Sequence, residues 1–407
     1  MEAEVLNALR DPAGLPTHPI VFLVLGVLTF ALHIAAVQIM LGASSLTLWG
    51  ALSKNSYRRQ LADDMLGVAK VMLSVAIVIG VAPLLFVQVV YDPFWYVSNV
   101  LSAWWVIGFI GILIVGYVAM YWFYWQNESL ADNPTKCPGS MLIALVLLLT
   151  VGFIMHVLTS QMLQPDQWMT WYAPNGVLDT SGRHIHAYSL SRFAFFISLS
   201  VPVIGAFLLA YRRYLRVKPS ADHAYLDWVG GLAMKAITLG GVLSLIIGAV
   251  WLSGLEGTQA AFATSPWVML SAVALLATVA YAVWTWMSAR DSFHSYFVLA
   301  VGAVALIVVA AARELFRWSI LVDGFGFDAW NYPLNLDWYS TILFFATFVV
   351  VGGSVLSYFL TVSWQAGQTE GVYTPSPLVT KIGQVALAIV VLWIVQFFAV
   401  GFYVWMR

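Results

Sequence analysis

The stretch PIVFLVLGVLTFALHIAAVQIMLGASSLTLW, residues 19–49, decides the fold. It is apolar along almost its whole length, and about 20 such residues of helix cross the hydrocarbon of a bilayer. The run starts near Pro19, lacks a small-residue cleavage site and continues toward Trp49. We therefore expect a permanent first membrane helix and not a removable signal peptide.

The composition extends this expectation to the whole chain. Of the 407 residues, 61% are hydrophobic and 9% are charged, and the mean hydropathy is +0.87. Apolar runs recur that are too long for membrane strands. The predicted fold class is an all-α, polytopic transmembrane bundle of about ten helices. The expected spans are 19–50, 66–90, 100–125, 139–163, 189–215, 229–253, 265–288, 293–318, 338–363 and 379–405.

The expected domain organisation is a single membrane domain over 1–407. Within it we expect a first four-helix unit at 19–163, a five-helix unit at 189–363 and an extra C-terminal helix at 379–405. Cys137 is the only cysteine, which excludes a disulfide framework, a covalent CxxCH haem site and a thiolate metal cluster. A redox cofactor would have to bind noncovalently.

Lysine and arginine residues predict which loops are cytoplasmic, because such loops carry the excess of basic residues. The alternation of spans then places both chain ends and the loops 91–99, 164–188, 254–264 and 319–337 on the outer side. Basic residues are few and no phosphate-binding or zinc-binding motif occurs, so nucleic acid is not an expected partner. The basic residues that follow the first and fifth spans are Lys54, Arg58, Arg59, Arg212, Arg213, Arg216 and Lys218.

Two outward loops mix aromatic with polar residues. They read QPDQWMTWYAPNGVLDTSGRHIH over 164–186 and DGFGFDAWNYPLNLDW over 323–338. Such Trp and Tyr residues are typical of the aromatic belt at a membrane interface. The same residues would also suit a platform for quinol or for a partner protein, where aromatics pack a ring and Asp or His accepts protons. Both interpretations are open.

Chemistry is expected where polar side chains enter apolar spans, because a charge in hydrocarbon costs roughly 3 kcal/mol unless it is paired or hydrated. His33 and His156 each lie within a span, where one hydrogen bond could satisfy the imidazole or the ring could ligate haem iron. Gln161 is a helical neighbour that could satisfy His156. The other polar residues in or leading into spans are Lys70, Lys235, Arg183, His184, His186, Arg192, Arg313, Glu314 and Arg317.

The segment ARELFRWSI carries two interpretations. Arg313 and Arg317 are four residues apart and Glu314 precedes Arg317 by three, so the group could neutralise itself at a helix end. The same geometry offers one carboxylate as an iron ligand or proton acceptor and two guanidinium groups for haem propionates. A transporter is a further alternative, for which Pro83 and Pro202 are the helix-interior prolines to consider.

The order of these features resembles subunit I of the cytochrome bd quinol oxidases over most of the chain. FALHIAAVQIMLG is similar to the family's segment in which a haem-ligating histidine precedes a glycine by nine residues, here His33 and Gly42. VQVVYDPFWYVS resembles the exit of the family's second helix, and ARELFRWSI resembles its haem-ligating glutamate followed by Gly-Arg-Gln-Pro-Trp. Glu314 and Arg317 keep the glutamate-to-arginine spacing, and Met269 in PWVML stands where the family has a methionine ligand.

The chain also departs from the family's pattern. WWVIGFIGILIVGYVAMYW has no carboxylate where the family's third helix carries acidic residues, and only SGLEGTQAAFATSP replaces the long quinol-binding loop. LSRFAFF has no imidazole where the family's fifth helix has a histidine. A tenth helix is appended. These departures imply that oxygen reductase activity is doubtful.

The resemblance implies a diverged bd-like subunit of a bacterial inner membrane. It would bind haem b and pass electrons between quinol and an outer-face redox partner such as a c-type cytochrome. A haem-free membrane anchor of a larger redox complex and a transporter are the alternatives. Glu314 and Arg317 would be the reacting groups. The residues implied at the cofactor are His33, Glu314, Arg313, Arg317, His156 and Met269, with His33 and Glu314 on the iron.

Overall fold

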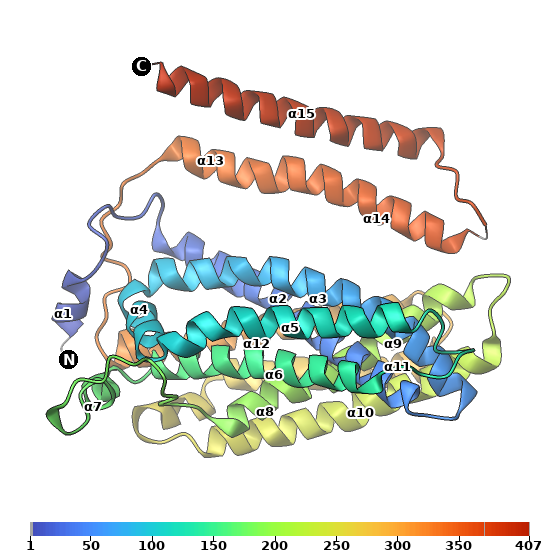
Figure 1. Cartoon of the computed structure of the whole chain (residues 1–407), viewed down its shortest axis with the longest axis horizontal. Coiled ribbons are helices and arrows are strands. Elements are labelled where there is room, and N and C mark those ends of the chain that lie inside the picture. The colour runs from blue at the N-terminus through green and yellow to red at the C-terminus, as the bar shows by residue number, and fades with distance from the viewer. Residues whose placement is uncertain (1–2, 370, 407) are drawn as a thin grey trace. The chain divides into compact units, whose positions relative to one another are not determined.

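The computed structural model describes residues 3–369 and 371–406 and is built from helices (Figure 1). Within these residues the only β-type pairing is one bridge between Leu15 and Leu334. Ten helices in the described part of the chain are long and apolar enough to cross a membrane, which confirms the predicted all-α class. These spans are Pro19–Ala51, Ser56–Val90, Ala103–Gln126, Pro138–Gln161, Leu190–Arg216, His223–Ser253, Pro266–Ser288, His294–Gly324, Trp338–Gln368 and Pro377–Trp405.

The α-helices follow one another along the chain with short 3₁₀ and π segments between some of them. Their bounds are α1 Ala3–Ala8, α2 Pro19–Ala51, α3 Ser56–Val90, α4 Asp92–Leu101, α5 Ala103–Gln126, α6 Pro138–Gln161, α7 Trp168–Tyr172, α8 Leu190–Ser198, α9 Ser200–Arg216, α10 His223–Ser253, α11 Pro266–Ser288, α12 His294–Trp318, α13 Trp338–Ala346, α14 Gly353–Gln368 and α15 Pro377–Trp405. Three 3₁₀ segments lie at Pro165–Gln167, Pro174–Gly176 and Gly257–Thr264, and two π segments at Ser319–Gly324 and Thr347–Gly352.

Polar caps set where several of the long helices begin. Asn55 Oδ1 accepts a hydrogen bond from the Arg58 backbone N–H at 3.1 Å, and Asp222 Oδ1 accepts one from Tyr225 N–H at 3.1 Å. Each cap satisfies a backbone donor that the first helical turn leaves unpaired. Helices α3 and α10 therefore begin before the predicted spans at 66 and 229, because hydropathy marks the hydrocarbon and not the polar turns outside it.

The fifth span is broken into two helices. Helix α8 ends at Ser198 and α9 begins at Ser200, with Pro202 in the first turn of α9. Proline has no N–H to continue the ladder of the preceding turn, so it is tolerated at a helix start and interrupts a helix interior. The result is a separate nine-residue helix, α8, between the long 164–189 loop and α9.

The described chain separates into two compact units. Unit 1 comprises residues 3–11 and 19–332, and unit 2 comprises residues 12–18 and 333–406. In unit 2, α13 and α14 run antiparallel to α15, and Trp393 Nε1 donates to Thr347 Oγ1 at 3.0 Å. The grouping of helices expected from the sequence, at 19–163, 189–363 and 379–405, stays a prediction.

A large buried cluster of unit 1 lies toward one end of its helices, which we call the basic end because it holds the loops 52–55 and 217–222. Gly42 permits close approach of α2 and α9 there, since a Cβ at this position would lie 2.4 Å from Ile204 Cβ. The buried core of the basic end includes Leu61, Met65, Leu66, Met120, Phe123, Met141, Leu208, Leu226 and Val229.

An ion-pair network between a buried arginine and two exposed carboxylates also lies at the basic end. The Arg212 side chain is fully buried, and its Nη2 lies 2.8 Å from Asp227 Oδ1 and 2.8 Å from Asp291 Oδ1. Arg212 also donates to the backbone carbonyls of Leu226 and Arg290, so each of its three guanidinium nitrogens has an acceptor. The opposite end of unit 1 is not packed in this way, and it contains the cavities described next.

Candidate functional site

His33 lies in the middle of α2, and its imidazole contacts α3. Its Nδ1 is 3.0 Å from the backbone carbonyl oxygen of Ala76. A carbonyl oxygen can only accept, so Nδ1 carries the hydrogen and the neutral ring keeps a lone pair on Nε2. A histidine fixed in this way through one nitrogen and free at the other has the arrangement of a metal ligand.

Gly80 on α3 makes room for this imidazole. A Cβ at position 80 would lie 2.8 Å from both Nδ1 and Cε1 of His33. Any side chain at this position would therefore displace the ring or spread α2 from α3. The position of His33 depends on a glycine that is distant in sequence and that the sequence pattern does not single out.

The C-terminal turn of α12 carries the three charged residues predicted from the sequence. Arg317 Nη1 donates to Glu314 Oε2 at 2.8 Å, and Arg313 Nη1 lies 4.0 Å from the same oxygen. The other oxygen, Glu314 Oε1, is buried and has no hydrogen-bond partner. Both arginines therefore face one oxygen of the carboxylate, and the second oxygen is available to a further group.

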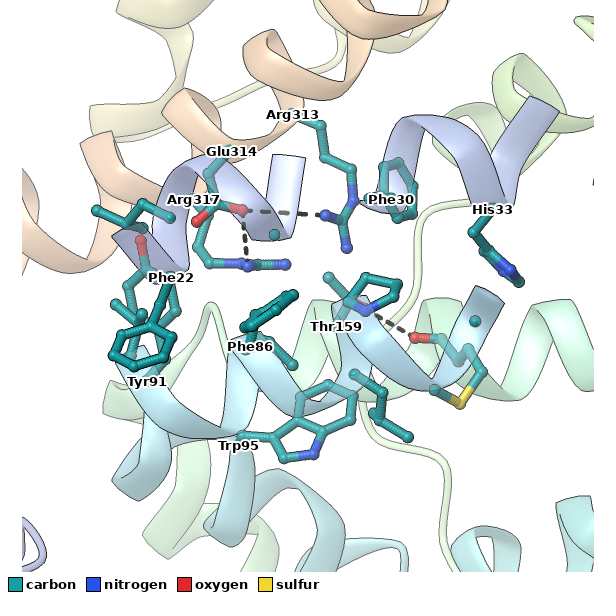
Figure 2. A pocket seen from close by; sticks show the side chains of 18 residues that line it. Phe22, Phe30, His33, Phe86, Tyr91, Trp95, Thr159, Arg313, Glu314 and Arg317 are labelled. Atoms are coloured by element: carbon teal, nitrogen blue, oxygen red, sulfur yellow. Dashed lines mark hydrogen bonds and ion pairs between the residues drawn. The ribbon is translucent and has the colours of Figure 1, made fainter. Parts of the chain in front are cut away.

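Aromatic rings hold the two arginines in place. The Arg313 guanidinium lies 4.0 Å from the ring centroid of Phe30, and that of Arg317 lies 5.2 Å from the ring centroid of Tyr91. Such cation–π contacts orient a guanidinium without neutralising it. Figure 2 shows Arg313 extending toward Phe30, beside Glu314 and Arg317.

These residues line one cavity of about 130 Å³ at the end of unit 1 opposite the basic end. Figure 2 shows His33 on one side of it and Glu314 with Arg317 on the other. Its walls are largely apolar, yet Trp95 Nε1 and Arg317 Nε, like Glu314 Oε1, are buried without a hydrogen-bond partner. The residues that line it are Phe22, Leu23, Gly26, Phe30, His33, Gly80, Pro83, Leu84, Phe86, Val87, Val90, Tyr91, Trp95, Met155, Thr159, Arg313, Glu314 and Arg317.

The donor set of this cavity fits a haem. The free His33 Nε2 and the unpaired Glu314 Oε1 are the ligand types that haem iron accepts, and Arg313 and Arg317 match the geometry of carboxylate groups. Unpaired buried polar atoms are rare in folded proteins, so their concentration here favours a polar or charged ligand. The cavity of about 130 Å³ is smaller than a haem, so its lining would have to open to admit one.

The structure places the other two candidate ligands away from this cavity. His156 Nε2 accepts the backbone N–H of Ser189 at 3.0 Å, at the start of α8, while its neighbours Met155 and Thr159 line the cavity. Met269 on α11 is 59% exposed and lines neither cavity described here. The structure thus brings His33, Arg313, Glu314 and Arg317 together, but not His156 or Met269.

A second cavity of about 260 Å³ lies among α8, α10, α11 and α12. Arg313 lines this cavity as well as the first one. Among the described residues that line it there is no His, Cys, Met, Asp or Glu. These residues are Phe195, Phe196, Leu245, Gly248, Ala249, Trp251, Leu252, Phe262, Val268, Ser271, Ala272, Leu275, Val309, Ala312 and Arg313.

A hydrogen-bonded carboxyl lies next to the wall of the first cavity. Tyr332 Oη donates to Asp92 Oδ1 at 2.6 Å and to the Val90 carbonyl at 2.8 Å, and the Arg10 guanidinium lies 4.4 Å from the Tyr332 ring centroid. Burial raises the pKa of Asp92 above its usual value, although the Tyr332 hydrogen bond opposes this shift. Asp92 directly follows Tyr91, which lines the cavity, so its carboxyl lies near the cavity margin.

The 164–186 loop has its own polar contacts. His184 Nε2 lies 3.3 Å from Asp179 Oδ2, and the His186 ring stacks on Trp171 at 5.2 Å. Burial lowers the pKa of His186 below its usual value. No residue of this loop lines either cavity, so its role as a quinol or partner platform stays a prediction.

Several residues of the first cavity were not predicted as site residues. Tyr91 and Trp95 fall in the segment VQVVYDPFWYVS, whose aromatic residues were noted, but nothing in that pattern shows that they face Glu314. Phe30 stands three residues before His33, on the same helical face. In the described part of the chain, no three His, Cys, Asp or Glu side chains are grouped closely enough to hold a metal ion by themselves.

Comparisons with known proteins support the fold. No family model and no curated protein matches the chain. A solved chain described as "The structure of bd oxidase from Geobacillus thermodenitrificans" is similar to it, with a TM-score of 0.65 and 12% sequence identity. The match covers 86% of this chain and 98% of that chain. The fold is therefore bd-oxidase-like, at a sequence distance where the likeness concerns the fold alone.

Proposed function

We propose that this protein is a membrane electron-transfer subunit that binds haem b and passes electrons between quinol and a redox partner on the outer face. The observation that carries the proposal is the convergence of His33, with a free Nε2, and Glu314, with a free Oε1, on one apolar cavity. The Tyr91 hydroxyl, which belongs to the same cavity lining, is likewise buried without a hydrogen-bond partner.

The chain's own residues would each have a defined part. His33 Nε2 would bind the haem iron, with the imidazole oriented by its hydrogen bond to the Ala76 carbonyl. Glu314 would face the iron or accept a proton, and Arg313 and Arg317 would hold the propionates. The haem, when bound, supplies one-electron chemistry. Its potential would depend on the ligand type, the burial and the nearby arginines.

Quinol oxidation would release protons toward the outer side. Glu314 is the acceptor nearest to the cavity, and Asp92 is a half-buried carboxyl at its margin. The raised pKa of Asp92 brings this group closer to the pH range where it can both take up and release a proton. We infer that Asp92 passes protons to the outer aqueous phase.

We also propose that the subunit does not reduce oxygen to water efficiently. Helix α5, Ala103–Gln126, contains no Asp or Glu that could deliver protons along it. The connection between α10 and α11 is a short segment around Gly257–Thr264, too small for an extended quinol-binding loop. The electrons would therefore leave through a partner, of which a c-type cytochrome on the outer face is the expected kind.

The experiment that tests this function is anaerobic reduction by a short-chain quinol. Purified protein should show haem reduction in the visible spectrum and should then consume little oxygen when air is admitted. A colourless preparation that co-purifies with cytochromes would instead support the membrane-anchor alternative. Rapid, cyanide-sensitive oxygen uptake without an added oxidase would contradict the proposed electron route.

A further inference from the structure

Arg192 on α8 is a buried cation without a counterion. The residue is 5% exposed, and its guanidinium makes no hydrogen bond or ion pair with any described residue. Its Cζ lies only against aromatic faces, 5.3 Å from the ring centroid of Phe316 and 5.6 Å from that of Trp251. A buried charge in a membrane span is expensive unless an opposite charge or water compensates it.

Arg313 is also short of an acceptor. Its only acidic neighbour in the described chain is Glu314, whose Oε2 lies 4.0 Å away and already accepts from Arg317 at 2.8 Å. Three arginines and one glutamate give +3 − 1 = +2, so the cluster carries two uncompensated positive charges.

We propose that Arg192, Arg313 and Arg317 form the binding site for the anionic groups of an amphiphilic ligand. The guanidinium donors match carboxylate or phosphate oxygens, and the two apolar cavities that share Arg313 would take the ligand's apolar body. Arg192 itself lines neither cavity, but its guanidinium lies 5.6 Å from the ring centroid of Trp251, which lines the second one. Two carboxylates would compensate the net charge of +2 in full, whereas one phosphodiester would compensate one of the two charges.

Two sources supply this chemistry: the propionates of haem and the phosphate of an anionic lipid. Haem as the ligand rests on the proposed function, whereas an anionic lipid as the ligand does not. The competing explanation is that Arg192 is held by Trp251 and Phe316 alone. In that case, removing its charge would weaken packing and would leave anion binding unchanged.

The test uses the full-length chain, expressed under haem limitation and purified in a neutral detergent. One arm titrates it with hemin, followed by absorbance. The other arm adds phosphatidylglycerol, and each arm records the thermal midpoint with and without the ligand. Arg192→Met keeps the apolar volume and removes the charge, Arg192→Lys restores a charge, and Lys235→Met removes an exposed cation on α10 as a matched control.

The expected result is that at least one of the two ligands raises the midpoint of the wild-type chain. Arg192→Met should weaken binding of that ligand by about tenfold or more, Arg192→Lys should partly restore it, and Lys235→Met should not change it. Without ligand, Arg192→Met should be at least as stable as the wild type, because an unpaired buried charge has been removed.

The outcomes separate the two proposals. If hemin binding depends on Arg192, the anionic groups that the site binds are the haem carboxylates. If only phosphatidylglycerol binding depends on Arg192, the site binds a lipid phosphate and the proposed haem function is wrong. The anion site is overturned if neither ligand stabilises the wild type, or if Arg192→Met binds both as the wild type does. Equal destabilisation of Arg192→Met with and without ligand would likewise leave Arg192 as a packing residue.

Discussion

At the scale of single residues, the two carboxylate oxygens of Glu314 have different surroundings, so one can stabilise the fold while the other can bind a further group. Oε2 accepts from Arg317, whereas Oε1 is buried and unpaired. An unsatisfied buried acceptor costs about 1–3 kcal/mol, so a bound group that pairs with it is favoured. His33 has the complementary property, with Nδ1 engaged and Nε2 free. Two residues distant in sequence thus each offer one open coordination position.

Glu314→Gln tests this residue directly. The amide keeps the shape and removes the charge, leaving Arg313 and Arg317 less compensated, at a cost of roughly 1–3 kcal/mol in unfolding free energy. We expect a shifted haem midpoint potential and slower electron transfer from quinol per folded molecule, measured by spectroelectrochemistry and stopped flow. The exposed Glu256→Gln is the control. An unchanged spectrum, potential and turnover would show that Glu314 has only a structural role at the end of α12.

Asp92→Asn tests the carboxyl at the cavity margin. Because burial raises the folded-state pKa of Asp92 above its usual 3.8, ionising it costs stability at pH values above the raised pKa. Lowering the pH through that pKa relieves the cost, so this group favours folding more at lower pH. The variant should therefore be less sensitive to pH in this window than the wild type. Thermal midpoints measured across it should show the difference, and parallel pH profiles would contradict it.

At the scale of secondary-structure elements, the site depends on how closely α2 and α3 approach each other. The imidazole of His33 lies against Gly80, whose missing side chain leaves space for the ring. The sequence predicted His33 because an imidazole inside an apolar run is conspicuous. It did not predict Gly80, Tyr91 or Trp95, because their roles depend on the rotation of α3 and α4 about their axes.

Gly80→Ala tests this helix contact. The added methyl would lie 2.8 Å from His33 Nδ1 and Cε1, so we expect lower haem affinity or an altered haem spectrum. Gly67→Ala on the same helix is the matched control, since no atom lies within 4 Å of the added Cβ. That control should keep the spectrum and gain up to about 1 kcal/mol in stability from helix propensity. Identical spectra for both variants would show that His33 does not depend on this space.

At the scale of the whole molecule, hydropathy alone predicted the ten spans, because the length of an apolar run is set by bilayer thickness. It did not predict that α3 and α10 begin with polar turns at Ser56 and His223, since caps such as Asn55 act outside the hydrocarbon. Hydropathy also carries no signal for the division of the chain at residue 332, because that division depends on which helices pack together.

The single cysteine permits a test of the proposed orientation. Cys137 is exposed in the loop before α6, which the basic residues place on the cytoplasmic side. A membrane-impermeant maleimide applied to intact cells should not label it, whereas broken cells should be labelled. In a Cys137→Ser background, the exposed Asn175→Cys in the 164–186 loop should react in intact cells. The reverse labelling pattern would show that the topology is inverted and that the proposed quinol oxidation would occur on the inner side.

We propose that the cavity between α2 and α12 holds haem through His33. The most direct measurement is the pyridine haemochrome content per chain of the purified wild type, compared with His33→Ala and with the control His223→Ala at the start of α10. We predict a b-type spectrum for the wild type and for the control, and the loss of at least one haem per folded chain in His33→Ala. A colourless wild type, or a folded His33→Ala variant with full haem content, would contradict the account.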